Sequence, residues 1–257
     1  MIPACQRPCS QTSLFLNAVL RPGRPARPVL LWLLALAGLL NAGVPAQAQS
    51  VCSSDGQRPA AGLHERFINA DCAGCWTAAG TPAARPGKLS LDWVLPGDQG
   101  DDAPLSAVAR RDSLERLQAL GLPLPAGQPQ HDAHDARVAG GKGWRLRVAH
   151  GIAFNGYLGV SIEFKHRGTL PPAKDLPLTV WLALVETLPA GTEGSPVERQ
   201  LVRGLFKTDW DRRQPGAVLS RSMAVSEGVN PERLSLVGWL ENARGGLLTA
   251  VQSGCRR

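Results

Sequence analysis

The chain has 257 residues, of which 44% are hydrophobic, and it carries a formal net charge of +7. Its basic residues are scattered and have acidic neighbours, as in "VARRDSLER", and they form no basic stripe with interleaved aromatic residues. Such a stripe is the electrostatic footprint of a nucleic-acid-binding surface. The composition therefore argues against nucleic acid as a partner and leaves the positive charge as a contribution to solubility.

Residues 1–48 have the features of a secretory signal peptide. Residues 29–40 form an uncharged apolar run that is too short to span a bilayer comfortably but suits a signal-peptide core. Arg21, Arg24 and Arg27 stand shortly before it, and Ala46-Gln47-Ala48 fits the small-x-small cleavage rule. We expect cleavage near this point and a periplasmic or secreted protein with a net charge of +3, because four arginines and no acids are removed. An uncleaved anchor is the alternative, and we expect no membrane span in the mature chain.

Four cysteines remain after the leader, namely Cys52, Cys72, Cys75 and Cys255. In an oxidising compartment an even number indicates disulfides, and four cysteines allow three pairings. Adjacency favours Cys72 with Cys75, which leaves Cys52 with Cys255, and the ends of compact chains often lie close together. We therefore predict a structural disulfide between Cys52 and Cys255 that stabilises the fold by about 4–5 kcal/mol in the chain-entropy model.

Residues 49–125 have a pattern typical of an α/β beginning. "HERFIN" (64–69) and "KLSLDWVL" (88–95) predict two short buried strands. Between them a short helix is predicted to begin at the cysteines and to end in the following Gly/Pro-rich stretch. "LSAVARRDSLERLQALG" (105–121) has the best helical pattern, with a glycine at its C-cap. The order strand, C-x-x-C, helix, strand, helix is a βαβ-type beginning.

The composition shifts after that point. Residues 126–143 are rich in Pro and Gly and have no periodicity, so we interpret them as a connection between two domains. Residues 144–257 alternate in a β pattern and include a possible Asn155-Gly156 hairpin turn. Six or seven strands at this spacing predict an antiparallel, sandwich-like β domain.

The stretch "NADCAGCWTA" (69–78) carries the most distinctive chemistry. In a thioredoxin-type site a buried strand delivers the first cysteine to a helix N-terminus, where free backbone N–H groups stabilise the thiolate. On this interpretation Cys72 is the attacking thiol and Cys75 resolves the mixed disulfide. Asp71 acts against it, because a like charge beside Cys72 raises the pKa of that thiol.

Two other interpretations of the cysteine pair stay open. The disulfide can simply fasten the strand–helix junction. Alternatively, His131 and His134 follow about 55 residues later, and two thiolates with two imidazoles make a tetrahedral zinc set. That spacing is far longer than in compact zinc modules, and the histidines sit in a polar segment, so we predict neither a metal nor another cofactor. The chain has no G-x-S-x-G, P-loop or H-E-x-x-H motif, so a hydrolase has no support.

Six segments spread over the mature chain carry a family resemblance. They are "FINADCAGC" (67–75), "LSLDW" (89–93), "RLQALG" (116–121), "LTVWLALVE" (178–186), "VERQLVRGL" (197–205) and "VGWLENARGGLLTAVQ" (237–252). With the leader and the C-x-x-C, they make the chain resemble the secreted thioredoxin-like family catalogued as domain-of-unknown-function family 1223. The resemblance implies an α+β fold class, with a thioredoxin-like α/β domain followed by an antiparallel β-sandwich-like domain, and Cys72 and Cys75 as the site.

The chain departs from that family in two places. The family has prolines after the second cysteine and a Thr-Pro step before a strand that faces the disulfide, whereas this chain has Trp76-Thr77. Pro123, Pro125 and Pro129 stand in the right region, but none leads into a predicted strand. These departures argue against a working substrate site, whereas the strand–cysteine–helix layout favours an exported thiol–disulfide oxidoreductase acting on exported cysteine-containing proteins. The alternative is a non-catalytic periplasmic binding or envelope-assembly module whose disulfides are all structural.

Overall fold

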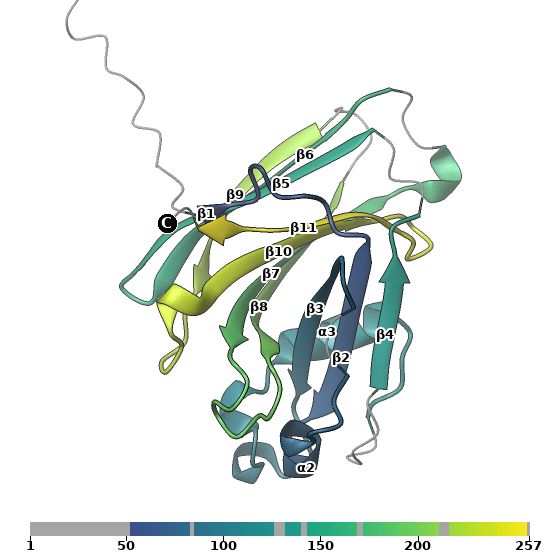
Figure 1. The fold of residues 1–257 in the computed structure, drawn as a ribbon. Helices are drawn as coiled ribbons and strands as arrows, with labels where there is room; N and C mark the ends of the chain where they lie inside the picture. The colour runs from purple at the N-terminus through teal and green to yellow at the C-terminus, as the bar shows by residue number, and fades with distance from the viewer. Residues whose placement is uncertain are drawn as a thin grey trace, which may run out of the picture. The chain divides into compact units, whose positions relative to one another are not determined.

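A computed structural model of the chain describes residues 52–82, 85–125, 132–139, 143–168, 172–210 and 216–255. Within these ranges the protein has a mixed α+β fold, mostly β, with two sheets and two α-helices (Figure 1). Residues 48–257 group into one compact unit. The helices in the described ranges include none with the length and apolar character needed to span a membrane. The predicted signal peptide lies outside the described residues.

The first sheet has five antiparallel strands in the order β12-β1-β5-β6-β9. Their bounds are Cys52–Ser53 (β1), Trp144–Phe154 (β5), Tyr157–His166 (β6), Gly216–Ala224 (β9) and Gly254–Cys255 (β12). The β5–β6 hairpin turns at Asn155 and Gly156, whose φ angles are 49° and 75°. Both angles are positive, as a type I′ turn requires, and the predicted hairpin is confirmed.

The second sheet has seven strands in the order β11-β10-β7-β8-β3-β2-β4. Their bounds are Gly62–Asn69 (β2), Lys88–Leu95 (β3), Asp132–Arg137 (β4), Leu178–Leu188 (β7), Arg199–Trp210 (β8), Leu234–Glu241 (β10) and Leu247–Gln252 (β11). β3 runs parallel to both β2 and β8, and the other pairs are antiparallel.

The predicted separation into two domains at residues 126–143 is wrong. Asp92 of β3 pairs with Leu201 of β8, so one continuous sheet contains strands from both predicted domains. A strand next to another strand gains backbone hydrogen bonds that a free edge lacks. Those hydrogen bonds form only when β3 and β8, which are far apart in sequence, come together in the fold. The local sequence pattern of either half does not encode this pairing.

The predicted irregular connection also contains a strand, β4, which pairs antiparallel with β2. Its sequence "DAHDAR" has no apolar alternation that would predict a strand. The strand forms nevertheless, because an edge strand needs only backbone pairing with its neighbour. The Asp135 carboxylate accepts hydrogen bonds from Lys88 Nζ at 2.5 Å and His64 Nδ1 at 3.1 Å. These contacts, led by the one from Lys88, lower the pKa of Asp135 to about 2.

The helices are shorter than predicted. α2 spans Ala73–Thr77 and α3 spans Arg111–Ala119. The predicted helix over 105–121 is interrupted at Arg110, which is extended at φ −131° and ψ 137° and donates its N–H to the Val94 carbonyl at 3.0 Å. Short 3₁₀ turns lie at Gly100–Asp102, Ser106–Val108, Ala173–Asp175 and Pro231–Arg233.

Two apolar layers hold the sheets and α3 together. One lies between the two sheets and includes Val148, Ile162 and Leu182. A Cβ added to Gly238 of β10 would lie 2.5 Å from Val148 Cγ1, so glycine at this position permits the close approach of the two sheets. The other apolar layer covers the opposite face of the seven-stranded sheet and contains Leu117 of α3.

A buried ion cluster fastens α3 to the sheet. The Arg116 guanidinium is fully buried and donates to both Glu65 carboxylate oxygens at 2.8 Å and to both Glu241 oxygens at 2.7 and 3.0 Å. Glu241 also accepts the indole N–H groups of Trp181 at 2.8 Å and Trp239 at 3.1 Å. Burial alone lowers the pKa of Arg116, but Glu65 and then Glu241 outweigh it, and the net shift is upward.

Replacing Arg116 by leucine should lower the free energy of unfolding by about 3–5 kcal/mol, because two buried carboxylates then lose their counter-ion. Urea unfolding followed by tryptophan fluorescence measures the change. The control is Arg244→Leu, which removes a surface pair with Asp175 and should cost less than about 1 kcal/mol. An equal effect of the two substitutions would contradict the role given to the cluster.

The two ends of the described chain meet at a disulfide. Cys52 of β1 stands opposite Cys255 of β12, and their sulfurs are bonded across a sequence separation of 203 residues. The predicted pairing is confirmed.

Replacing Cys52 and Cys255 together by serine should lower the free energy of unfolding by about 5 kcal/mol, since the unfolded chain loses a very long closed loop. The same measurement on Cys72→Ser/Cys75→Ser should show a smaller loss, because that loop is only three residues long in sequence separation. Equal losses for the two double variants would refute this explanation.

Candidate functional site

The Cys72–Cys75 pair lies where β2 passes into α2. The Cys72 N–H donates to the Asn69 carbonyl at 3.0 Å, so a tight turn brings the chain out of the strand. The two sulfurs are bonded, with Cα atoms 5.3 Å apart, and Cys72 Sγ accepts the N–H of Cys75 at 3.1 Å. Cys72 and Cys75 are only 6% and 7% exposed. The predicted strand–cysteine–helix layout is confirmed, and the pair is largely covered.

Asp71 directs its carboxylate to the loop that follows β3. Its oxygens accept the backbone N–H groups of Asp98 at 2.8 Å and Gln99 at 3.3 Å. A Cβ on Gly97 would fall 2.1 Å from Asp71 Oδ1, so the loop closes tightly around the carboxylate. These donors partly compensate the negative charge that the sequence placed next to Cys72.

Trp76 joins α2 to the loop between β7 and β8. Its side chain is buried, and the indole Nε1 donates to the Glu193 carbonyl at 2.7 Å. The Arg199 guanidinium lies 5.0 Å from the centre of its ring. In the ribbon, α2 accordingly lies at the same end of the molecule as the turn that links β7 and β8 (Figure 1).

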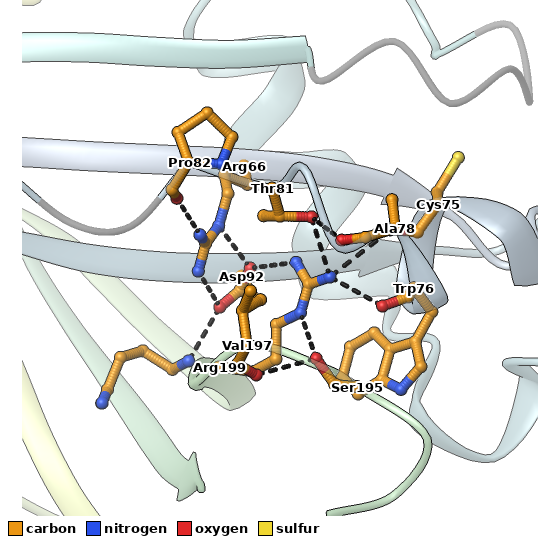
Figure 2. A network of polar contacts seen from close by, with 11 residues as sticks. Arg66, Cys75, Trp76, Ala78, Thr81, Pro82, Asp92, Ser195, Val197 and Arg199 are labelled. Carbon is orange, nitrogen blue, oxygen red and sulfur yellow. Dashed lines mark hydrogen bonds and ion pairs between the residues drawn. The ribbon is translucent and has the colours of Figure 1, made fainter. Parts of the chain in front are cut away.

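Arg199 is the first residue of β8 and lies behind the cysteine pair. It is fully buried, and its Nη2 donates to the carbonyls of Trp76 at 2.8 Å and Cys75 at 3.4 Å (Figure 2). Arg199 also donates from Nε to Ser195 Oγ at 2.9 Å and from Nη2 to Thr81 Oγ1 at 3.3 Å. One guanidinium therefore holds the C-terminal carbonyls of α2, the loop after it and the start of β8 together.

Asp92 joins Arg199 to a second buried arginine. Arg66 Nε and Nη2 donate to the two Asp92 oxygens at 2.6 and 2.7 Å, and Arg199 Nη1 lies 3.4 Å from Oδ1 (Figure 2). Asp92 also accepts the backbone N–H of Gln200 at 2.7 Å, and Arg66 donates to the Pro82 carbonyl at 2.8 Å.

The cluster of Arg66, Asp92 and Arg199 has two cations and one anion, which leaves an excess of one positive charge. All three residues are at most 3% exposed. Burial lowers the pKa of Arg199, Asp92 raises it and Arg66 lowers it, with a net downward shift. Sequence reasoning missed this cluster. Its signal was weak, because Arg66 and Asp92 lie inside predicted strands that contain other polar residues, and Arg199 begins a strand with several further charged residues.

The alternative zinc set finds no support among the described residues. His131 lies outside them, and His134 is on β4 opposite Glu65. Within the described ranges, the one group of at least three His, Cys, Asp or Glu ligand atoms lying within 4.8 Å of one another is Cys52, His150 and Cys255. Its two sulfurs are already joined in a disulfide.

His150 is buried next to the Cys52–Cys255 bridge on the adjacent strand. Its Nδ1 lies 2.8 Å from the Gly151 carbonyl. Burial lowers the pKa of His150, and the weaker effect of that carbonyl only partly offsets it. The folded protein therefore favours the neutral imidazole.

This lowered pKa predicts an acid-sensitive contribution to stability. The contribution is complete above the unfolded pKa of about 6.5 and is lost as the pH falls from there through the lower folded value. Unfolding free energies measured from pH 7.5 to pH 5 should fall less steeply for His150→Gln than for the wild type. Identical slopes would contradict the prediction.

Comparison with known proteins adds little to this site. The chain matches no family model and no curated protein. Among solved structures it is similar to HBP35 of Porphyromonas gingivalis, with a TM-score of 0.46 and 10% sequence identity, over 76% of this chain and 74% of that chain. Function therefore has to be inferred from the cysteine pair and its surroundings.

Proposed function

We propose that this protein is an exported thiol–disulfide exchange protein in which Cys72 is the attacking cysteine and Cys75 the resolving cysteine. The observation that carries the proposal is a C-x-x-C disulfide at the junction of a buried strand and a helix, within a parallel β2–α2–β3 unit. A C-x-x-C next to a βαβ pattern is the mark of thioredoxin-like redox proteins. The signal-peptide pattern of residues 1–48 supports export and exported proteins as partners.

The segment after α3 adds support for a thioredoxin-like first part. Asn69 Nδ2 donates to the Pro125 carbonyl at 3.4 Å, and Asp132 of β4 stands opposite Phe67 of β2. The chain thus returns to the cysteine end of β2 and begins a strand there. We expected no strand after these prolines, and that expectation is corrected by β4. Pro129 itself lies outside the described residues.

The exchange chemistry needs only the two sulfurs of the pair and those of a partner. In the reduced protein the Cys72 thiolate attacks a partner disulfide, forms a mixed disulfide and releases one partner thiolate. The Cys75 thiolate then attacks Cys72 Sγ, which closes the 72–75 bond and releases the second. The Cys75 N–H that Cys72 Sγ accepts favours the thiolate over the thiol at Cys72.

The non-catalytic alternative rests on a different observation. Both cysteines are more than nine-tenths buried, and α2 is fastened on its inner side by Trp76 and Arg199. A purely structural role, in which the disulfide holds the strand–helix junction, is sufficient to explain a disulfide in such a position. In that case the protein is a binding or envelope-assembly module whose two disulfides are structural.

The reduction potential of the Cys72–Cys75 pair decides between the two functions. The full chain is expressed with the two cysteines of the predicted signal peptide replaced (Cys5→Ser and Cys9→Ser), so that they add no thiols to the count. The protein is equilibrated in graded glutathione or dithiothreitol buffers, and alkylated thiols are counted by mass. We expect titration between about −120 and −270 mV, the range of known exchange proteins. Cys75→Ala should then trap partners as mixed disulfides. A pair that stays oxidised below about −300 mV is structural and refutes the exchange function.

A further inference from the structure

We propose that the buried cluster of Arg66, Asp92 and Arg199 favours the reduced form of the Cys72–Cys75 pair and so makes the protein a donor of disulfides to exported dithiol proteins. This inference rests on the proposed exchange function. It assigns a direction to that function and a role to three side chains that do not touch the reacting sulfurs. Arg199 is in these terms a positioning residue and a source of charge.

The positive charge of Arg199 lies close to the backbone of Cys75. Arg199 Nη2 contacts the carbonyl of Cys75 itself and that of Trp76, so the guanidinium lies at the backbone of the resolving cysteine, whose sulfur points away from it (Figure 2). Arg199 and Asp92 are fully buried. A charge that is shielded from water acts over a longer distance than an exposed one, because neither solvent nor salt screens it well.

Only the reduced form of the Cys72–Cys75 pair responds to this charge. The disulfide is neutral, whereas reduction creates two thiols, and a thiol that loses its proton becomes an anion. A nearby cation lowers a cysteine pKa and stabilises this thiolate. Stabilising the reduced form makes a disulfide more oxidising, since the pair then releases its bond more readily.

The opposing charge near the pair is Asp71. Its carboxylate is bound by the N–H groups of Asp98 and Gln99, on the loop after β3. No comparable set of backbone donors binds Asp92 among its described contacts, which are two arginines and the single N–H of Gln200. The net charge of the buried cluster is positive because two guanidinium groups face one carboxylate, whereas the N–H groups stabilise the Asp71 carboxylate without removing its charge.

The transfer is balanced between the pair and its partner. A partner thiolate attacks Cys72 Sγ, the 72–75 bond breaks, and Cys75 leaves as a thiolate stabilised by the buried charge. The second partner thiolate attacks the partner sulfur of the mixed disulfide and releases Cys72. Two electrons and two protons pass from the partner dithiol to the pair, the partner gains its disulfide, and no further oxidant enters this single turnover.

A purely structural role for the cluster would predict something different. Both Arg199→Gln and Asp92→Asn remove buried contacts and should destabilise the fold. If the cluster acts only through structure, the two variants have no reason to shift the reduction potential of the Cys72–Cys75 pair in opposite directions. A charge effect must change sign, because one substitution removes a positive charge and the other a negative one.

The test compares these two variants with a matched control, in the Cys5→Ser/Cys9→Ser background. Arg203→Gln removes another buried arginine of β8, which pairs with Glu186 and makes no contact with α2 among the described hydrogen bonds and ion pairs. For each variant, glutathione redox titration measures the equilibrium constant for reducing the Cys72–Cys75 pair.

We expect Arg199→Gln to lower this equilibrium constant about tenfold, which is about 30 mV, and Asp92→Asn to raise it by a similar factor. Arg203→Gln should stay within about twofold of the wild type. Arg203 lies four residues beyond Arg199 on β8, which is about 13 Å along a strand, and the interaction between two charges weakens with distance.

Circular dichroism checks that each variant is folded before titration. If Asp92→Asn does not fold, Arg199→Lys replaces it, because lysine keeps the positive charge but cannot reproduce the guanidinium contacts with the Cys75 and Trp76 carbonyls. A charge effect predicts a constant within about threefold of the wild type for Arg199→Lys, whereas a structural effect predicts a loss similar to that of Arg199→Gln. Shifts of equal sign for Arg199→Gln and Asp92→Asn, or none, overturn this inference while leaving exchange intact. A wild-type pair that cannot be reduced overturns the exchange function itself.

Discussion

The Asp92 carboxylate holds together the part of the molecule on which the candidate site depends. It accepts hydrogen bonds from Arg66 of β2 and from the backbone of β8, and it pairs with Arg199, whose guanidinium holds the end of α2. Since β3 is paired with β8 at Asp92 itself, the join between the two halves of the sheet and the support of the cysteine pair meet at one side chain.

Consecutive residues of β2 serve the two faces of this sheet. Side chains alternate along a strand, so Glu65 and Arg66 point in opposite directions. Glu65 binds Arg116 and fastens α3 on one face, whereas Arg66 binds Asp92 on the other. Buried ion pairs can often be replaced by apolar residues without loss of stability. The proposed effect on the reduction potential gives the buried excess of positive charge a role other than stability.

The local patterns predicted most of the strands and both disulfides. The sequence "KLSLDWVL" forms β3 with the predicted bounds, and the Asn155-Gly156 hairpin forms as expected. The patterns failed where backbone pairing decides the outcome. β4 forms from a polar segment because the edge of β2 is available, and the helix predicted over 105–121 breaks at Arg110 because that residue is bound to Val94 of β3.

The sequence by itself determined the strand–cysteine–helix order, which follows from local periodicity. It also favoured the correct cysteine pairing, because Cys72 and Cys75 are adjacent and only Cys52 and Cys255 then remain. Only the tertiary structure decided that the two halves share one sheet, and that Arg66, Asp92 and Arg199 meet behind Cys75. These residues lie up to 133 positions apart, and strand alternation could show only that their side chains point inward. Whether a buried charge finds a partner depends on which strands become neighbours, and the pairing of β3 with β8 settles that.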